Sequence, residues 1–319
     1  MKMNFNNFYN KYGTIIILLV MVAVVTLIEP KFIGFDNIMN IFKQVSINGL
    51  IAFGMTFVIL TGGIDLSVGA IVGLTGMVMG LLITNGTNEI IAMVAALGLG
   101  AILGYINGFF VANMKLQAFI VTLATMTTFA GITLLISDAR PASGITKKVE
   151  GVSQAPVINF FSQGEIFGLP FPMILMFIML VILMVVLHKT KFGRGVYAIG
   201  GNEEVARLSS IPTNRYKRLV YTISGFMSAL AGIILVSRLS SAQPTAGTGF
   251  ELDAIAAVVI GGTSLAGGKG RIFGTFIGVL IIGVLNTGLN LIGISSFWQQ
   301  IIKGLVILGA VLLDRKGSR

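Results

Sequence analysis

The stretch "ILTGGIDLSVG", residues 59–69, separates two long apolar segments with a pair of glycines and a single carboxylate. Residues 39–60 before it and 66–84 after it are mostly apolar. Gly62 and Gly63 readily end a helix, and Asp65 is a good N-cap for the helix that would begin at Leu66. The stretch therefore predicts two helices joined by a sharp break.

Apolar segments of this kind recur along the whole chain. Of its 319 residues, 55% are hydrophobic and 11% are charged, and the mean hydropathy is +0.93. Such a composition leaves too little polar surface to cover a water-soluble globule. Since a bilayer-spanning helix needs roughly 20 apolar residues, we predict an all-α polytopic membrane protein with about ten transmembrane helices, at 13–29, 39–60, 66–84, 90–112, 117–137, 170–188, 217–238, 251–264, 272–291 and 297–313.

The distribution of Lys and Arg predicts the orientation. Ten spans place both termini on one side, and with cytoplasmic termini 15 of the 22 basic residues lie inside, against five outside and two (Lys43 and Lys303) within spans. This positive-inside bias explains the net charge of +10 without a nucleic-acid partner. We expect one transmembrane domain over residues 1–319, with an outer loop near 138–169 and a cytoplasmic loop near 189–216.

The sequence offers little to an enzyme. It has no cysteine and one histidine, His188, and it lacks a phosphate-binding GxxxxGK[ST] loop. The stretch "GGKGR" at 267–271 has the wrong spacing and predicts a tight inner turn. We therefore predict no catalytic residues, no metal site and no cofactor bound by this chain. If ATP drives the protein, another chain must supply the ATP site.

Two ionisable residues at membrane depth are candidates for function. Asp65 is one, because a carboxylate in a bilayer is costly, although the helix cap explains it more simply. Lys303 is the other, in "FWQQIIKG" at 297–304 beside Gln299 and Gln300. Trp298 marks the outer interface. Lys303 is therefore expected to snorkel outward, and a polar wall of a translocation pathway is the alternative.

Uncharged amides within the predicted spans have two interpretations. They are suited to hydrogen-bond a hydroxylated, uncharged solute, and they are also ordinary interhelical contacts. The same ambiguity applies to the glycines at 100, 104 and 108, whose smooth face we expect to pack within the chain rather than at a dimer seam. The amides are Asn48, Asn107, Asn286 and Asn290.

The inner loop contains a predicted short helix. Asn202 is a good N-cap, Glu203 and Glu204 are acids at the N-terminal end of the helix, and Arg207 lies nearer its C-terminal end. An apolar stripe runs along this helix with nothing in its own loop to cover it, and Pro212 is expected to stop it. The stripe consists of Val205, Leu208 and Ile211. The residues alone leave two alternatives open: a docking helix and a solvated surface turn.

Three stretches carry a resemblance to a known family. They are "QVSINGLIAFGMTFVILTGGIDLSVGAIVG" (44–73), "FGRGVYAIGGNEEVARLS" (192–209) and "SRLSSAQPTAGTGFELDAIAAVVIGGTSLAGGKGR" (237–271). The chain resembles, in register over almost its whole length, the ribose-type permeases of bacterial ATP-binding-cassette importers. It departs from them at Ser210, where these permeases usually have glycine.

The resemblance implies a membrane subunit in the bacterial cytoplasmic membrane that pairs as a dimer. It also implies a cytoplasmic ATPase that binds ATP and Mg²⁺, an extracytoplasmic sugar-binding protein, and a coupling helix in the loop between the sixth and seventh spans. The helix beginning at Asn202 matches that position, which favours the docking helix over the surface turn.

The remaining expectations concern the substrate and the outer surface. The resemblance favours ribose or a related small sugar, and the pathway candidates are Asn48, Asp65, Asn107, Asn286, Asn290, Gln300 and Lys303. Docking of the binding protein is expected on outer loops, at Gln243, Glu251 and Asp253. An ion-coupled secondary sugar transporter or channel is the alternative function, and a membrane-embedded enzyme is remote.

Overall fold

The computed structural model describes residues 5–146, 148–149, 152–153 and 155–317, and its elements are almost all helical. The helices are α1 (Phe5–Ile28), η1 (Pro30–Ile33), α2 (Phe35–Leu60), α3 (Val68–Thr84), α4 (Glu89–Ala112), α5 (Ala118–Ser137), α6 (Pro156–Gln163), α7 (Phe171–Lys189), α8 (Lys191–Gly201), α9 (Glu203–Leu208), α10 (Thr213–Leu239), α11 (Phe250–Ile260), α12 (Ile272–Leu291) and α13 (Ser296–Gly317).

The strands have two residues each and pair antiparallel. β1 (Ala142–Ser143) pairs with β6 (Ser241–Ala242), β2 (Lys148–Val149) with β3 (Val152–Ser153), and β4 (Glu165–Ile166) with β5 (Leu169–Pro170). In the first pair Ala142 is opposite Ala242 and Ser143 opposite Ser241. This pairing fastens the segment after α10 to the loop that follows α5.

Each of the ten predicted apolar segments coincides with a helix. Within the described residues, six helices are long and apolar enough to cross a membrane: α2, α4, α5, α7, α10 and α12. Residues 13–28 of α1 and the whole of α3 are shorter apolar helices. Several predicted boundaries were wrong: α1 begins at Phe5 rather than 13, α3 at Val68 rather than Leu66 and α10 at Thr213 rather than 217, and α11 ends at Ile260 rather than 264.

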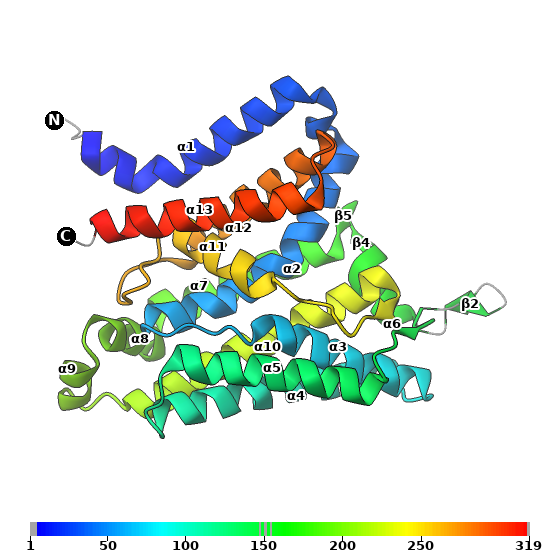
Figure 1. Ribbon diagram of the computed structural model, residues 1–319, viewed down its shortest axis with the longest axis horizontal. Coiled ribbons are helices and arrows are strands. Elements are labelled where there is room, and N and C mark those ends of the chain that lie inside the picture. The colour runs from blue at the N-terminus through cyan, green and yellow to red at the C-terminus, as the bar shows by residue number, and fades with distance from the viewer. Residues whose placement is uncertain (1–4, 147, 150–151, 154, 318–319) are drawn as a thin grey trace.

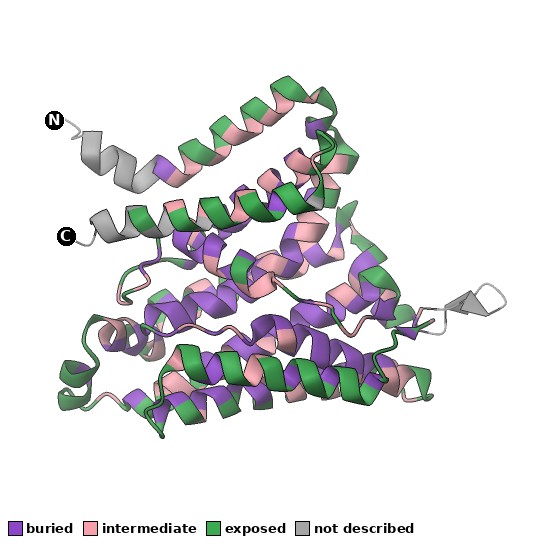
Figure 2. Cartoon of the chain, in the orientation of Figure 1, coloured by how far each residue is buried: buried purple, intermediate pink, exposed green. Residues whose placement is uncertain are grey.

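Most of the helices run side by side along the long axis of the molecule. In Figure 1, α1 and α13 form one edge and α4 and α5 the opposite edge, with α2, α11, α3 and α10 between them. Burial follows this order: Figure 2 shows purple along the central helices and mostly green along α5 and α13. The most apolar parts of α2 and α10 are 83% and 72% buried, against 22% for α5, so the first two form the core.

The glycine face of α4 packs within the chain, as predicted. A methyl group added at Gly100 would lie 2.6 Å from the Gly225 carbonyl oxygen, and one at Gly104 would lie 2.2 Å from the Tyr221 carbonyl oxygen. At Gly108 it would lie 2.7 Å from the Arg218 Cα. Only glycine allows α4 and α10 to approach this closely, so the two helices are held by backbone contact.

Two irregular segments interrupt the bundle. Residues 61–67 precede α3 and residues 240–249 precede α11. The second segment lies against the first turn of α3, where a methyl group on Gly69 or Gly247 would lie 2.3 Å from the carbonyl oxygen of the other. Gly247 also has φ +85°, a conformation that L side chains rarely adopt. Both positions therefore require glycine.

Candidate functional site

The coupling region, defined as residues 189–216, forms two short helices after α7. The first, α8, begins at Thr190, whose hydroxyl accepts a hydrogen bond from the Gly193 amide at 3.2 Å. Its other end lies against the end of α2, since a methyl group at Gly200 would lie 1.8 Å from the Leu60 carbonyl oxygen. The same carbonyl accepts a hydrogen bond from the Gly268 amide at 3.0 Å. The helix α8 is thus fixed to α2 and to the loop after α11.

The Tyr197 side chain strengthens the attachment of α8 to the loop after α11. The Tyr197 hydroxyl donates to the Gly270 carbonyl oxygen at 2.7 Å. Burial raises the pKa of Tyr197, against the smaller opposing effect of the Arg271 charge. The hydroxyl therefore stays protonated at neutral pH and keeps donating to the loop.

The second helix, α9, has the predicted N-terminus. The Asn202 side chain accepts hydrogen bonds from the Glu204 and Val205 amides, both at 3.0 Å, which confirms it as the N-cap. The Arg207 and Glu204 side chains approach to 3.8 Å on the exposed face. Ala206 is buried, whereas Val205 and Leu208 are 56% and 78% exposed. A short helix thus presents apolar side chains outward.

The predicted C-terminus of this helix was wrong. α9 ends at Leu208, so Ile211 lies beyond it, and Pro212 precedes the first residue of α10 rather than stopping α9. The turn is made by Ser210, which has φ +61°, and by the Ile211 amide, which donates to the Ala206 carbonyl oxygen at 3.1 Å. This is the left-handed helix-ending turn that glycine favours.

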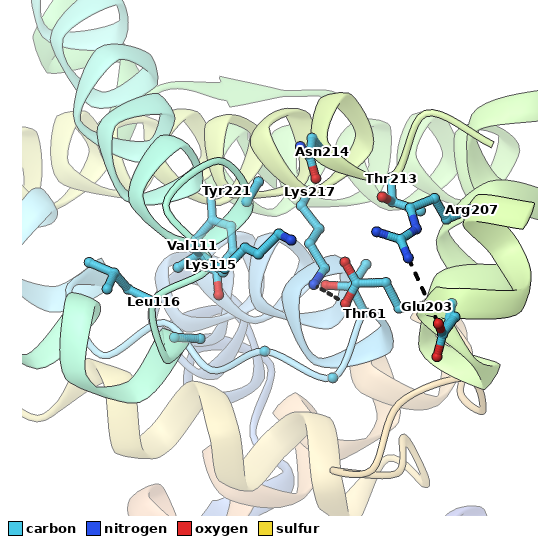
Figure 3. Close-up of a pocket in the computed structure, with 15 residues that line it drawn as sticks. Thr61, Val111, Lys115, Leu116, Glu203, Arg207, Thr213, Asn214, Lys217 and Tyr221 are labelled. Carbon is cyan, nitrogen blue, oxygen red and sulfur yellow. Dashed lines mark hydrogen bonds and ion pairs between the residues drawn. The ribbon is translucent and has the colours of Figure 1, made fainter. Parts of the chain in front are cut away.

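A cavity of about 480 Å³ separates α9 from the bundle (Figure 3). It is lined by three cations, Lys115, Arg207 and Lys217, and by the carboxylates Glu203 and Glu204. Lys217 of α10 makes an ion pair with Glu203 at 2.5 Å, and its side chain is only 15% exposed. This ion pair joins α9 to the start of α10 across the cavity.

Asp65 lies inside the bundle and is fully buried. Its Oδ1 accepts hydrogen bonds from the Ser67 amide at 3.0 Å and the Ser67 hydroxyl at 2.6 Å. Its Oδ2 accepts from the Ser224 hydroxyl of α10 at 2.9 Å. The predicted helix start at Leu66 was wrong, because α3 begins at Val68. The predicted capping interaction of Asp65 is present, since its carboxylate accepts the amide two residues on. Asp65 also ties this turn to α10.

Asn107 extends this group of polar side chains to α4. Its Nδ2 donates to the Ser67 hydroxyl at 2.7 Å, while its Oδ1 is buried without a hydrogen-bond partner among the described residues. The hydroxyl of Tyr221 is buried and unpartnered there as well. Since buried polar atoms normally have partners, these two atoms can accept or donate to a further group.

A second polar group joins α2, α11 and α13. Lys303 Nζ lies 3.1 Å from both carboxylate oxygens of Asp253, and the Asn48 amide approaches the same carboxylate at 3.5 Å. The expectation that Lys303 snorkels outward was wrong, because its ammonium is held by an acid on a neighbouring helix. The outer-surface position expected for Asp253 was also wrong, because this residue lies in α11 and is 7% exposed.

The other candidates are dispersed. Asn290 accepts a hydrogen bond from Gln299 at 2.7 Å, and Asn286 is buried with its Oδ1 unpartnered among the described residues. Gln300 is exposed. Gln243 is half-buried and donates to the Ser241 hydroxyl at 2.8 Å, and Glu251 lies near Gly69. The structure therefore gathers Asp65 with Asn107, and Asn48 with Lys303, but not all seven pathway candidates.

Comparison with known proteins decides the family. The family described as "Branched-chain amino acid transport system / permease component" matches residues 37–311, a range that includes Asp65, Asp253, Lys303 and the coupling region. The chain belongs to this permease family.

Relatives of the permease are similar over nearly their whole length. It is 53% identical to the ribose import permease protein RbsC of Bacillus subtilis, over 99% of this chain and 96% of the relative. It is 50% identical to RbsC of Escherichia coli K12, over 95% and 93%. It is 43% identical to the D-allose transport system permease protein AlsC of E. coli K12, over 99% and 95%. No solved structure gives a significant match.

Three contacts of the permease were missed from the sequence. Lys217 pairs with Glu203, Asp253 pairs with Lys303, and the Glu89 carboxylate accepts hydrogen bonds from the Val157 and Ile158 amides at the start of α6. Only the Asp253–Lys303 pair could have been predicted from the sequence, because opposite charges in two apolar segments suggest an ion pair. Within the described part of the permease, no group of three or more His, Cys, Asp or Glu residues could hold a metal ion.

The hydrogen bonds of Asp65 generate a test of its role. Asp65→Asn keeps one acceptor oxygen, and the Ser224 hydroxyl can rotate to accept from the new amide, so we expect a loss of about 1 kcal/mol of stability. Asp65→Ala leaves donors unpaired at about 1–3 kcal/mol each. Thermal unfolding should therefore rank wild type, Asn, then Ala, with uptake per inserted molecule nearly unchanged in Asp65→Asn. Normal abundance and melting of Asp65→Asn combined with abolished uptake would show that the charge itself is needed.

Proposed function

We propose that this permease is the membrane subunit of an ATP-driven importer for ribose or a related small sugar. The observation that carries the proposal is α9, whose Val205 and Leu208 are 56% and 78% exposed in the described part of the chain. The names of the relatives, which specify ribose and D-allose, supply the substrate class. An ion-coupled sugar transporter remains the alternative, because the Asp253–Lys303 pair is ionisable and lies inside the bundle.

The proposed topology has ten transmembrane helices, α1 to α5, α7 and α10 to α13, with both termini cytoplasmic. It is supported by the segments 113–117, 189–216 and 261–271, which gather at one end of the bundle (Figure 1). These segments carry Lys115, most of the basic residues of the coupling region, and Lys269 with Arg271. Because cytoplasmic loops are enriched in Lys and Arg, this end is assigned to the cytoplasm and the end with α6 to the outside. The termini themselves, residues 1–4 and 318–319, lie outside the described residues.

Three partners follow from this function. A cytoplasmic ATPase, which binds ATP and Mg²⁺, would cover α9. An extracytoplasmic sugar-binding protein would dock on the outer end. Gln243 and Glu251 remain candidate docking residues there, whereas Asp253 is buried and is no longer one. A second copy of this permease would complete the translocation pathway, within the lipid of the bacterial cytoplasmic membrane.

The proposed pathway uses side chains suited to a neutral polyol. Asn48, Asn107, Asn286, Asn290 and Gln300 offer amide donors and acceptors, and Asp65 and Lys303 are each held by neighbouring groups. The partnerless Oδ1 atoms of Asn107 and Asn286 support the assignment, because each can accept a hydrogen bond from a sugar hydroxyl.

Single cysteines test the orientation, since the chain has none of its own. Cysteine at Asn214, exposed beside α9, should resist an impermeant thiol reagent in intact cells and react after the membrane is opened. Cysteine at Phe167, fully exposed in the turn between β4 and β5, should react from outside. The opposite pattern would contradict the proposed topology.

Leu208→Asp tests the docking role of α9. Burying a leucine side chain in an ATPase cleft is worth about 1.5–3 kcal/mol, and the new carboxylate adds a desolvation cost. Association with the ATPase should therefore weaken at least tenfold, since about 1.4 kcal/mol corresponds to a factor of ten. Co-purification of the ATPase and sugar uptake should fall together, while membrane abundance stays normal because Leu208 is 78% exposed.

The matched control is Arg215→Gln, which removes an exposed charge close to α9. Lys217 is unsuitable because its ion pair holds Glu203 of α9. Normal uptake by Leu208→Asp with its ATPase still bound would rule out α9 as the coupling helix.

A further inference from the structure

Lys43 is a cation in the apolar helix α2, and the proposed function gives it no role. Of the two lysines within predicted spans, Lys303 is paired with Asp253. Lys43 is half-buried, and among the described residues it has no ion pair or side-chain hydrogen bond. A charged side chain inside a membrane segment normally has a partner or a function, so Lys43 requires an explanation.

Lys43 shares a cavity of about 130 Å³ with a second cation, Arg238. The other polar side chains that line this cavity are Asn40, Ser162 and Gln163, and no acidic residue lines it. Arg238 lies in the last turn of α10, where a cation is favourable in any case. The helix dipole does not favour Lys43 in this way, because Lys43 lies in the third turn of α2 and not in its last turn. Two positive charges in one cavity repel each other, and an anion bound between them would offset the unfavourable electrostatic energy.

The start of α7 closes one side of this cavity. Pro172, in the first turn of α7, lines it, but Pro172 has no N–H and the Phe171 amide already donates to the Gly164 carbonyl oxygen at 2.8 Å. An anion would therefore be held by side chains. The cavity combines two cations, two amides and a hydroxyl, which together suit the oxygens of a phosphate group.

An apolar groove runs along the same helix. Leu169 of β5 and Met173, Phe177, Val181 and neighbouring side chains of α7 line this groove of about 430 Å³, and all of its lining side chains are apolar. Phe177 lies against Phe42, with ring centroids 6.3 Å apart, and Phe42 is adjacent to Lys43 in α2. The cationic cavity and the apolar groove are thus neighbours along α7. Ile178 and Val181 are 48% and 52% exposed, so the groove is open to a bilayer.

We propose that this permease holds an anionic glycerophospholipid at this place, with its phosphate in the cationic cavity and an acyl chain along the groove of α7. Charge complementarity selects the headgroup, and the apolar side chains of α7 that follow Pro172 favour a lipid over a free anion. The inference goes beyond the proposed function. Under the proposed topology this place lies in the outer leaflet, and only that assignment rests on the proposed function.

The test measures lipid retained by the full-length purified permease in nanodiscs that contain phosphatidylcholine with a minor fraction of phosphatidylglycerol. Native mass spectrometry should show phosphatidylglycerol enriched on the wild type. The double variant Lys43→Gln, Arg238→Gln should lose this enrichment by about tenfold, because both charge-assisted contacts are removed. The control Lys189→Gln, an exposed cation at the other end of α7, should retain it.

A second measurement does not depend on the variants. Phosphatidylglycerol should raise the thermal unfolding midpoint of the wild type relative to phosphatidylcholine alone, and millimolar inorganic phosphate should not. Equal lipid retention by the wild type and the double variant, or no stabilisation of the wild type by phosphatidylglycerol, would overturn the proposal. Stabilisation by inorganic phosphate without lipid enrichment would assign the cavity to a free anion. If the double variant lost binding-protein docking but retained lipid, Lys43 and Arg238 would be assigned to contact with the binding protein. This outcome and the free-anion outcome would each overturn the lipid site.

Discussion

The structure depends on providing hydrogen-bond partners and protein cover for irregular backbone inside an apolar bundle. Residues 61–67 and 240–249 leave the helical hydrogen-bond pattern, and in a bilayer such segments are tolerated only where protein surrounds them. Each segment is supported by neighbouring helices. Segment 240–249 packs against the start of α3 at Gly247 and Gly69, and the Asp65 carboxylate accepts hydrogen bonds from Ser67 of its own turn and from Ser224 of α10. Asn107 adds α4 to the same group, so one buried polar cluster fixes α3, α4 and α10 relative to one another.

This arrangement gives the coupling region two attachments to the bundle. The Leu60 carbonyl, at the end of α2, contacts both Gly200 of α8 and Gly268 of the loop after α11. The Lys217–Glu203 ion pair links α9 directly to α10. Under the proposed function, a displacement of α9 by an ATPase would reach α2 and α11 through the backbone contact and α10 through the ion pair. All three helices lie near the irregular segments, where the bundle departs from continuous helix.

Sequence reasoning located the helices well because hydrophobicity and length decide where an apolar segment lies. The break at Gly62–Gly63, the cap at Asn202 and the glycine face of α4 were also readable, since each depends on local chemistry. Long-range side-chain pairs were not predicted in this way. The hydrogen bond from Ser224 to Asp65 joins residues 159 apart in the chain. Lys303 was expected to snorkel because Trp298 lies close by, and its pairing with Asp253 of α11 was not predicted. The end of α9 was misjudged because Ser210 adopts a conformation expected of glycine.

The central claim is that ATP, rather than an ion gradient, drives sugar movement through this permease. Proteoliposomes that contain the permease and its ATPase, with binding protein and labelled ribose on the outer side, test it most directly. The account predicts accumulation that requires ATP inside the vesicles and continues when ionophores abolish every ion gradient. Accumulation that persists without ATP and collapses with the ionophores would contradict it.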